Sequence, residues 1–473
     1  MPIRPRHKNP SGRPPTASSP SLVERLERRI LFAIDVTLGT GSPSQALVFT
    51  DADGTVARVR VSGGTATITF DGNPVGQSTS GRLTTVTGTG VTMTNMVLSG
   101  ASPSVAVRAS GGGDGSVTLG GLSAAGPVRG IAAPGVVLTG PATLSNGIGR
   151  LTLGGARDTT LTINRSGQAL LQDASVSILS VTDAAITSQQ PMRQLRVGSW
   201  GLGNENQSNT VTTTRINVLQ CAGDFNAGLA LSGNGQVVGQ PVLGNAKVVG
   251  ALASGAWDVA GKTGRVAAGS VGSGWNGTFG DLSSFSTPGD FAGSISANTI
   301  NSLGAGSLTN AGIDVTRAFA TGATALNRLN VRGAIAGTRV RSGADIGSVS
   351  AASITGSSVF AGVANGGGGG GGAARSLPAD ASAFVSPATI KGVAIRTRGT
   401  PSFVGSNIAA STLGRINGGT IQVDNGGAPY GLAAQTILSL SGQRNDTGET
   451  RHVAGLTDPS DTIIVGDFQA RVF

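Results

Sequence analysis

The sequence predicts an all-β fold, an elongated parallel β-helix (β-solenoid), and three observations lead to that prediction. Short apolar segments recur along the chain between Gly, Asn, Asp, Ser and Thr, with no helical periodicity between them. Glycine is abundant, with 77 Gly in 473 residues, whereas only 4% of residues are aromatic and 12% are charged. The hydrophobic share of 38% is too high for a disordered chain. Stacked repeats around a thin aliphatic core are typical of this combination.

A glycine follows many of the apolar segments, and the spacing of these glycines is irregular. Gly289 and Gly306 are 17 residues apart, Gly306 and Gly333 are 27 apart, and Gly223 and Gly289 are 66 apart. Turns of about 17–25 residues with variable loops fit a parallel β-helix, whose strands stack ~4.8 Å apart. We expect Gly and Asn at the corners, because both tolerate positive φ.

Three regions are expected along the chain. Residues 1–36 combine a basic, Pro- and Ser-rich disordered tail with a short amphipathic helix that begins near Ser21. Residues 37–90 form a small antiparallel cap or the first turns, because residues 56–70 alternate as a hairpin. Residues 91–473 form the β-helix, and a Gly-rich loop at 364–382 projects from it. The alternative of a β-sandwich array needs longer alternating strands, which occur mainly before residue 75.

The net charge of +10 does not point to nucleic acid as a partner. The first 33 residues hold seven Lys or Arg against two Glu, which is half of the net charge. The other basic residues are scattered singly, without the clustering that nucleic-acid binding requires. Cys221 is the only cysteine, which excludes an intrachain disulfide and a Cys-based zinc site. No apolar run approaches the ~20 residues of a transmembrane segment.

Residues suited to catalysis are few. His7 and His452 are the only histidines, which argues against a histidine-based metal centre. Asp224 and Asp290 occupy equivalent Gly-Asp-Phe turns that we place about three turns apart, beyond the reach of a glycosidase pair. We therefore predict no catalytic residue and no cofactor other than calcium.

Calcium is considered because Asp51-Ala52-Asp53-Gly54-Thr55 resembles the start of a calcium loop. The late Glu of an EF-hand does not follow, so Asp51 and Asp53 are a weak calcium candidate. The alternative is a tight turn before the hairpin.

Three tryptophans, Trp200, Trp257 and Trp275, lie in the middle of the chain. If they are exposed, their rings would stack on sugars. The alternative is that they pack inside the coil.

Residues 26–33 resemble a sorting motif. Large surface and secreted proteins of planctomycete-type bacteria carry Leu-Glu-Pro-Arg-x-Leu-Leu near the N-terminus, and Leu26, Glu27, Arg29 and Leu31 match it. Arg replaces the proline at position 28, and Phe replaces the last leucine at position 32. The body also looks like the Gly-rich solenoid regions of such proteins, for example in Val-Gly-Ser-Trp-Gly at 197–201. The resemblance implies a surface or secreted location in bacteria and no established activity.

A non-enzymatic scaffold of structural or adhesive type, at the cell surface or secreted, is the leading hypothesis. Its expected partners are cell-envelope components or extracellular polysaccharide. A carbohydrate-binding or polysaccharide-cleaving β-helix is the first alternative, favoured if Asp224, Asp258, Asp281 or Asp290 shares a groove with a tryptophan. A cytoplasmic structural protein is the second, if the motif match at 26–33 is accidental.

Overall fold

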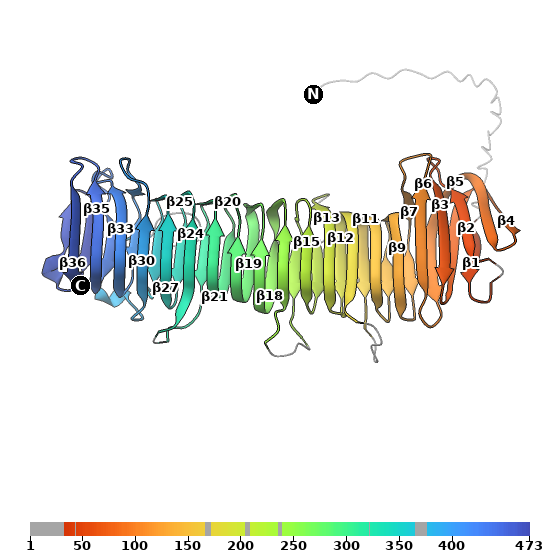
Figure 1. Cartoon of the computed structure of the whole chain (residues 1–473), viewed down its shortest axis with the longest axis horizontal. Coiled ribbons are helices and arrows are strands. Elements are labelled where there is room, and N and C mark those ends of the chain that lie inside the picture. Colours follow the sequence, from red (N-terminus) through yellow and green to blue (C-terminus); the bar gives the residue numbers. More distant parts are fainter. Residues whose placement is uncertain are drawn as a thin grey trace, which may run out of the picture.

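The described residues form an elongated all-β rod. The computed structural model describes residues 33–42, 44–165, 172–203, 209–234, 239–320, 322–364 and 376–473. Strands run across the long axis, and the coil makes about 14 turns, which confirms the predicted β-solenoid (Figure 1). The sorting-motif residues Leu26, Glu27, Arg29 and Leu31 lie outside the described residues, as does most of the expected helix. Ile34, expected at the end of that helix, instead begins the first strand.

An antiparallel cap forms the N-terminal end, as the sequence predicts. It consists of β1 (Ile34–Gly39), β2 (Ala46–Thr50), β3 (Val56–Ser62), β4 (Thr65–Ser80), β5 (Leu83–Ser99) and β6 (Ser104–Ser110). Antiparallel pairs join β1 to β4, β4 to β5, β2 to β3 and β3 to β6, whereas β2 and β5 are parallel. Buried and exposed residues alternate strictly along β3, because one face of this antiparallel sheet packs on the core and the other faces solvent. Antiparallel pairing extends to Ser110, past residue 90.

Beyond the cap, each turn of the coil contributes strands to three parallel ladders. The first ladder contains β9 (Val128–Leu138), β11 (Ile148–Ile163), β12 (Ala174–Ser188), β13 (Met192–Gly201), β15 (Ile216–Cys221), β17 (Leu243–Val248), β18 (Ala251–Ala267), β19 (Ser270–Ser286), β21 (Ser294–Ala305), β24 (Thr324–Val331), β27 (Asp345–Ala351), β30 (Thr389–Ile395), β33 (Thr412–Ile421) and β35 (Thr436–Arg444). The second contains β7 (Val117–Leu119), β20 (Asp290–Phe291), β22 (Ser307–Thr309), β25 (Ala334–Ala336), β28 (Ser353–Thr355) and β31 (Phe403–Val404). The third contains β8 (Leu122–Ala124), β10 (Ala142–Leu144), β14 (Thr210–Thr213), β16 (Gly228–Leu231), β23 (Gly312–Val315), β26 (Arg339–Ser342), β29 (Ser358–Ala361), β32 (Asn407–Ala409), β34 (Tyr430–Ala434) and β38 (Phe468–Val472). Long strands such as β11, β18 and β21 bend at the corners and join more than one ladder.

Identical positions of successive turns stack on one another inside the coil. One such row is fully buried and runs through Ile300, Leu326, Ile346, Ile390, Leu413 and Ile437. Stacked residues of neighbouring turns are usually 17 to 28 residues apart in the sequence, as for Asp290 and Ser307 (17) and for Leu229 and Trp257 (28). The separation rises to 44 residues between Val349 and Val393 and to 49 residues between Ile354 and Phe403, across the Gly-rich part of the sequence. Variable loops therefore interrupt the chain without breaking the stack, because only the strands carry the register.

A column of glycines forms one corner of the coil. Each N–H donates to the carbonyl of the glycine one turn before, at 2.6–3.1 Å, in the series Gly198, Gly223, Gly250, Gly269, Gly289, Gly306 and Gly333. Gly250 and Gly269 divide the 66-residue gap between Gly223 and Gly289 into three turns. The expectation of positive φ is wrong for these glycines, although Asn310 does adopt φ 53°. Except at Gly223, an added Cβ would lie less than 3.0 Å from a backbone atom of the preceding turn, as on Gly306, where it would be 2.3 Å from the Pro288 carbonyl oxygen.

The described residues next to the Gly-rich segment pack partly on the coil, whereas the outward projection of the loop at 364–382 stays a prediction. Leu377 packs with Phe360, Ala409 and Ala433 on the outer side of the third ladder. A 3₁₀ turn, η1 (Ala381–Ala383), follows, and Val363 forms a bridge with Phe384. Residues 365–375 lie outside the described part of the chain.

The C-terminal end is closed by antiparallel strands. β36 (Thr450–Leu456) pairs with β35, and β37 (Ile463–Val465) pairs with β38 after the turn η2 (Pro459–Asp461). Both ends of the coil thus carry a strand of reversed direction. Within the described residues, no helix has the length and apolar character to cross a membrane.

Candidate functional site

The three tryptophans lie inside the coil, so the prediction of sugar stacking is wrong. Trp200, Trp257 and Trp275 are 0–1% exposed. They form a chain of edge contacts through Phe225, with ring centroids 5.4, 5.9 and 5.7 Å apart. The indole N–H of Trp257 donates to the Ala227 carbonyl at 3.2 Å. Burial of large rings in a core otherwise made of small aliphatic residues explains these positions.

The tryptophans share no groove with the aspartates named above. Asp258 directly follows Trp257 along β18, so its side chain lies on the opposite, exposed face. Asp224, Asp281 and Asp290 are exposed as well. The grouping of a carboxylate with an indole that would favour carbohydrate cleavage is therefore not formed by these residues.

Asp224 and Asp290 act within the stack of turns. Asp224 Oδ1 accepts the N–H of Ala251 at 2.7 Å, and Asp290 accepts the hydroxyl of Ser307, so each carboxylate bonds the next turn. Pairing places Phe225 against Ala251, Leu252 against Val271 and Val271 against Phe291. The two aspartates are thus three turns apart, ~14 Å at the usual strand spacing. They cannot flank one scissile bond as a glycosidase pair does.

Asp51 and Asp53 form a hydrogen-bonded turn between β2 and β3. Asp51 Oδ1 accepts the N–H groups of Asp53 at 3.2 Å and of Thr55 at 2.9 Å. Asp53 Oδ1 accepts the Thr55 N–H at 2.9 Å, and its Oδ2 accepts the Asp114 N–H at 2.9 Å. Burial raises the pKa of Asp51, and a hydrogen bond to Asp53 adds to the shift. The hydrogen bond from the Asp51 side chain lowers the pKa of Asp53, and the backbone N–H groups of Asp114 and Thr55 lower it further.

A cavity of about 190 Å³ lies beside this turn and is lined by Asp51, Asp53 and Asp114. Calcium takes 6–8 oxygen ligands, whereas these carboxylates already accept backbone N–H groups. In the part of the chain that the structure describes, no three His, Cys, Asp or Glu residues group as a metal site. The geometry explains Asp51 and Asp53 as turn residues, and calcium binding there stays a prediction.

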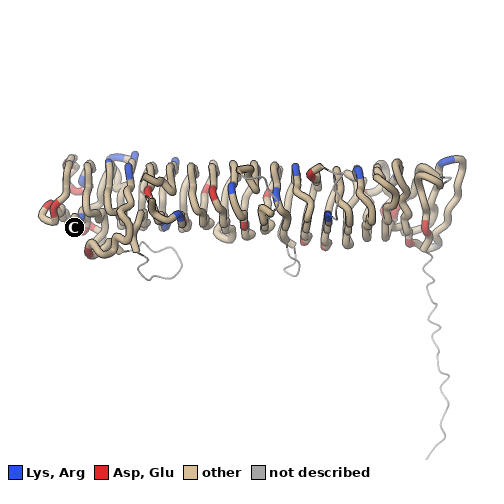
Figure 2. Tube along the Cα trace, turned by 90° about the horizontal axis from the view of Figure 1, so that it is seen from below, with Lys and Arg blue, Asp and Glu red and all other residues tan. Residues whose placement is uncertain are grey.

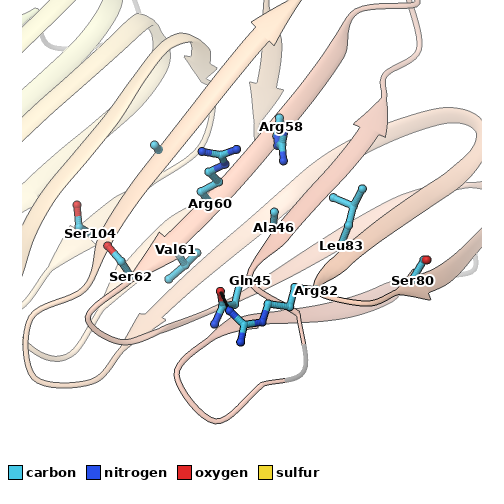
Figure 3. Close-up of a pocket in the computed structure, with 11 residues that line it drawn as sticks. Gln45, Ala46, Arg58, Arg60, Val61, Ser62, Ser80, Arg82, Leu83 and Ser104 are labelled. Atoms are coloured by element: carbon cyan, nitrogen blue, oxygen red, sulfur yellow. Dashed lines mark hydrogen bonds between the residues drawn. The ribbon is translucent and has the colours of Figure 1, made fainter.

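A basic cleft on the cap was not predicted from the sequence. It has a volume of about 570 Å³ and is lined by Arg58 and Arg60 of β3 and by Arg82 before β5 (Figure 3). The signal for it was the alternation of Arg58 and Arg60 around a buried valine, which puts both side chains on the outer face. The positions of Arg82 and of the flanking strands depend on long-range pairing, which the sequence does not reveal.

Comparison of this chain with protein-family models, curated proteins and solved structures finds no match.

Proposed function

We propose that the protein is a non-enzymatic structural or adhesive scaffold that is exposed at the surface of a bacterial cell or secreted. The observation that supports this proposal is the continuity of the coil. Three hydrogen-bonded ladders and one apolar core continue from β9 to β35 through every change in loop length. Such a body resists bending, because each turn is bonded to the turns on both sides along its whole length.

The outer surface of the coil suits a spacer. Lys, Arg, Asp and Glu are spread singly along the rod (Figure 2). Several of them bridge neighbouring turns, as Arg339 does with Asp314 at 2.8 Å. These polar groups therefore reinforce the stack while they keep the rod hydrated.

Support for the location comes from the resemblance of residues 26–33 to a sorting motif. If the motif directs export, the rod holds its binding surfaces at a fixed distance from the point at which the protein is anchored. Adhesion would then depend on the N-terminal cap or on the loops between the strands of the coil.

Protease shaving of intact producing cells tests the location. We expect the chain to be cleaved from intact cells while a cytoplasmic marker stays protected. Replacing two matching motif residues, in Leu26→Ala/Leu31→Ala, should reduce the cleaved fraction. The matched control is Ile30→Ala, at the position where the motif accepts any residue. Protection equal to that of the cytoplasmic marker would refute the surface assignment.

A further inference from the structure

We infer that the cleft on the N-terminal cap binds the carboxylate groups of an acidic polysaccharide. The cleft lies on the outer face of four adjacent strands, in the order β5, β2, β3 and β6. Figure 3 shows Arg58 and Arg60 side by side on β3 and Arg82 beside Gln45 at the lower rim. All three arginines are exposed.

Small residues create the hollow around Arg60. Its neighbour on β2 is Ala46, and its neighbour on β6 is Ala106. Because both flanking side chains stop at Cβ, the guanidinium of Arg60 stands in a depression. Leu83 on β5 continues the same row beyond Ala46.

The positive charge of the cleft is not neutralised by the protein. Arg58 lies directly opposite Arg108 on β6, an arrangement of like charges that destabilises an antiparallel pair. Among the described residues, no ion pair joins Arg58, Arg60, Arg82 or Arg108 to a carboxylate. The outward positions of β2, β3 and β6, all of them described, contain no Asp or Glu. A bound anion would relieve this repulsion.

The chemistry of the lining favours a sugar acid. A guanidinium group binds a carboxylate through two parallel hydrogen bonds, a bidentate geometry. Arg58 and Arg60 are two residues apart on one strand, ~6.8 Å, which suits a polymer with repeated acidic groups. Hydroxyls of Ser62, Ser80 and Ser104 line the same cleft and are able to bond sugar hydroxyls. No aromatic residue lines it, whereas single-stranded nucleic acid is bound largely by stacking on aromatic rings.

The choice of a polysaccharide rests on the proposed position outside the cell, but binding is measured on purified protein. A failed shaving experiment would thus refute the location without affecting the binding result. A failed binding experiment would refute polysaccharide binding at this cleft without affecting the proposed scaffold function.

Calorimetric titration of the full chain with polygalacturonate is the test. The cleft variant is Arg58→Gln/Arg60→Gln/Arg82→Gln, and the control is Arg150→Gln/Arg265→Gln/Arg415→Gln, which removes the same charge from exposed positions on the coil. We expect the cleft variant to bind about tenfold or more weakly. The control should stay within about twofold. Binding of the wild type should weaken as salt is raised.

Three results would overturn the inference. One is the absence of binding by the wild type. A second is equal loss in both variants, which would show that net charge alone attracts the polymer. The third is equal or tighter cleft-dependent binding of single-stranded DNA, which would make nucleic acid the partner. Neutral dextran serves as the uncharged control polymer, and circular dichroism checks that both variants keep the β fold.

Discussion

Replacing Gly306 by alanine tests how the glycine corner sets the distance between turns. An added Cβ would lie 2.3 Å from the Pro288 carbonyl oxygen and 2.7 Å from that of Gly289. Both atoms belong to the backbone of the preceding turn, so no side chain can move aside. The two turns must separate locally, which weakens the hydrogen bond from the Gly306 N–H to Gly289, 2.9 Å long. We expect a loss of about 1–3 kcal/mol, as for other overpacked sites.

Gly304→Ala is the matched control, two residues away in β21. Its added Cβ would lie 3.8 Å from the Asn330 carbonyl oxygen, which is an ordinary van der Waals contact. This variant should be neutral or more stable by about 0.4–1 kcal/mol, because alanine reduces the freedom of the unfolded chain. Urea unfolding followed by circular dichroism gives the midpoints. Hydrogen exchange across residues 289–335 gives a local measure, which is needed because a solenoid need not unfold in one step. Equal midpoints and equal local exchange in the two variants would refute the steric reasoning.

Three further predictions concern buried and paired groups. Burial raises the pKa of Tyr430, the only tyrosine, whose hydroxyl donates to the carbonyls of Phe403 and Gln422. Its stabilising effect is therefore complete below the ordinary pKa of ~10 and is lost as the pH rises above it. Phenolate absorbance should appear near that pH in denatured protein and only at higher pH in native protein, and coincident titration curves would contradict this. Tryptophan fluorescence should resist quenching by iodide until the chain unfolds, since all three indoles are buried, and strong native-state quenching would show that a ring is exposed. If Asp51 and Asp53 act only as turn residues, calcium should leave the thermal midpoint unchanged, whereas Asp53→Ala should lower it, because Asp53 accepts two backbone N–H groups. A rise with calcium that Asp53→Ala abolishes would establish a metal site instead.

The fold was predictable because its cause is local and repeated. Short apolar segments and recurrent glycines such as Gly289, Gly306 and Gly333 each reflect one turn. The role of these glycines was not predictable from propensity alone. Glycine is required there because a carbonyl group of the preceding turn lies too close for a Cβ. That carbonyl group belongs to a residue 17 or more positions away in the sequence.

The sites were harder to predict than the fold. The alternation of inward and outward side chains is interrupted near the corners of the coil. The sequence alone therefore does not decide whether Trp200 or Trp275 points into the core or toward solvent. The basic cleft depends on the pairing of Arg60 with Ala46 and Ala106, which are 14 and 46 residues away in the chain. No local pattern specifies that pairing.

One continuous coil should hold positions along the rod at fixed distances from one another. Arg150 and Arg415 are exposed and lie in one row of the first ladder, eleven turns apart. Spin labels on Arg150→Cys and Arg415→Cys, in a chain with Cys221→Ala, allow the distance to be measured by pulsed electron resonance. A rigid coil predicts a single narrow distribution near ~53 Å. A broad distribution, or a centre far from that value, would contradict the continuous rod.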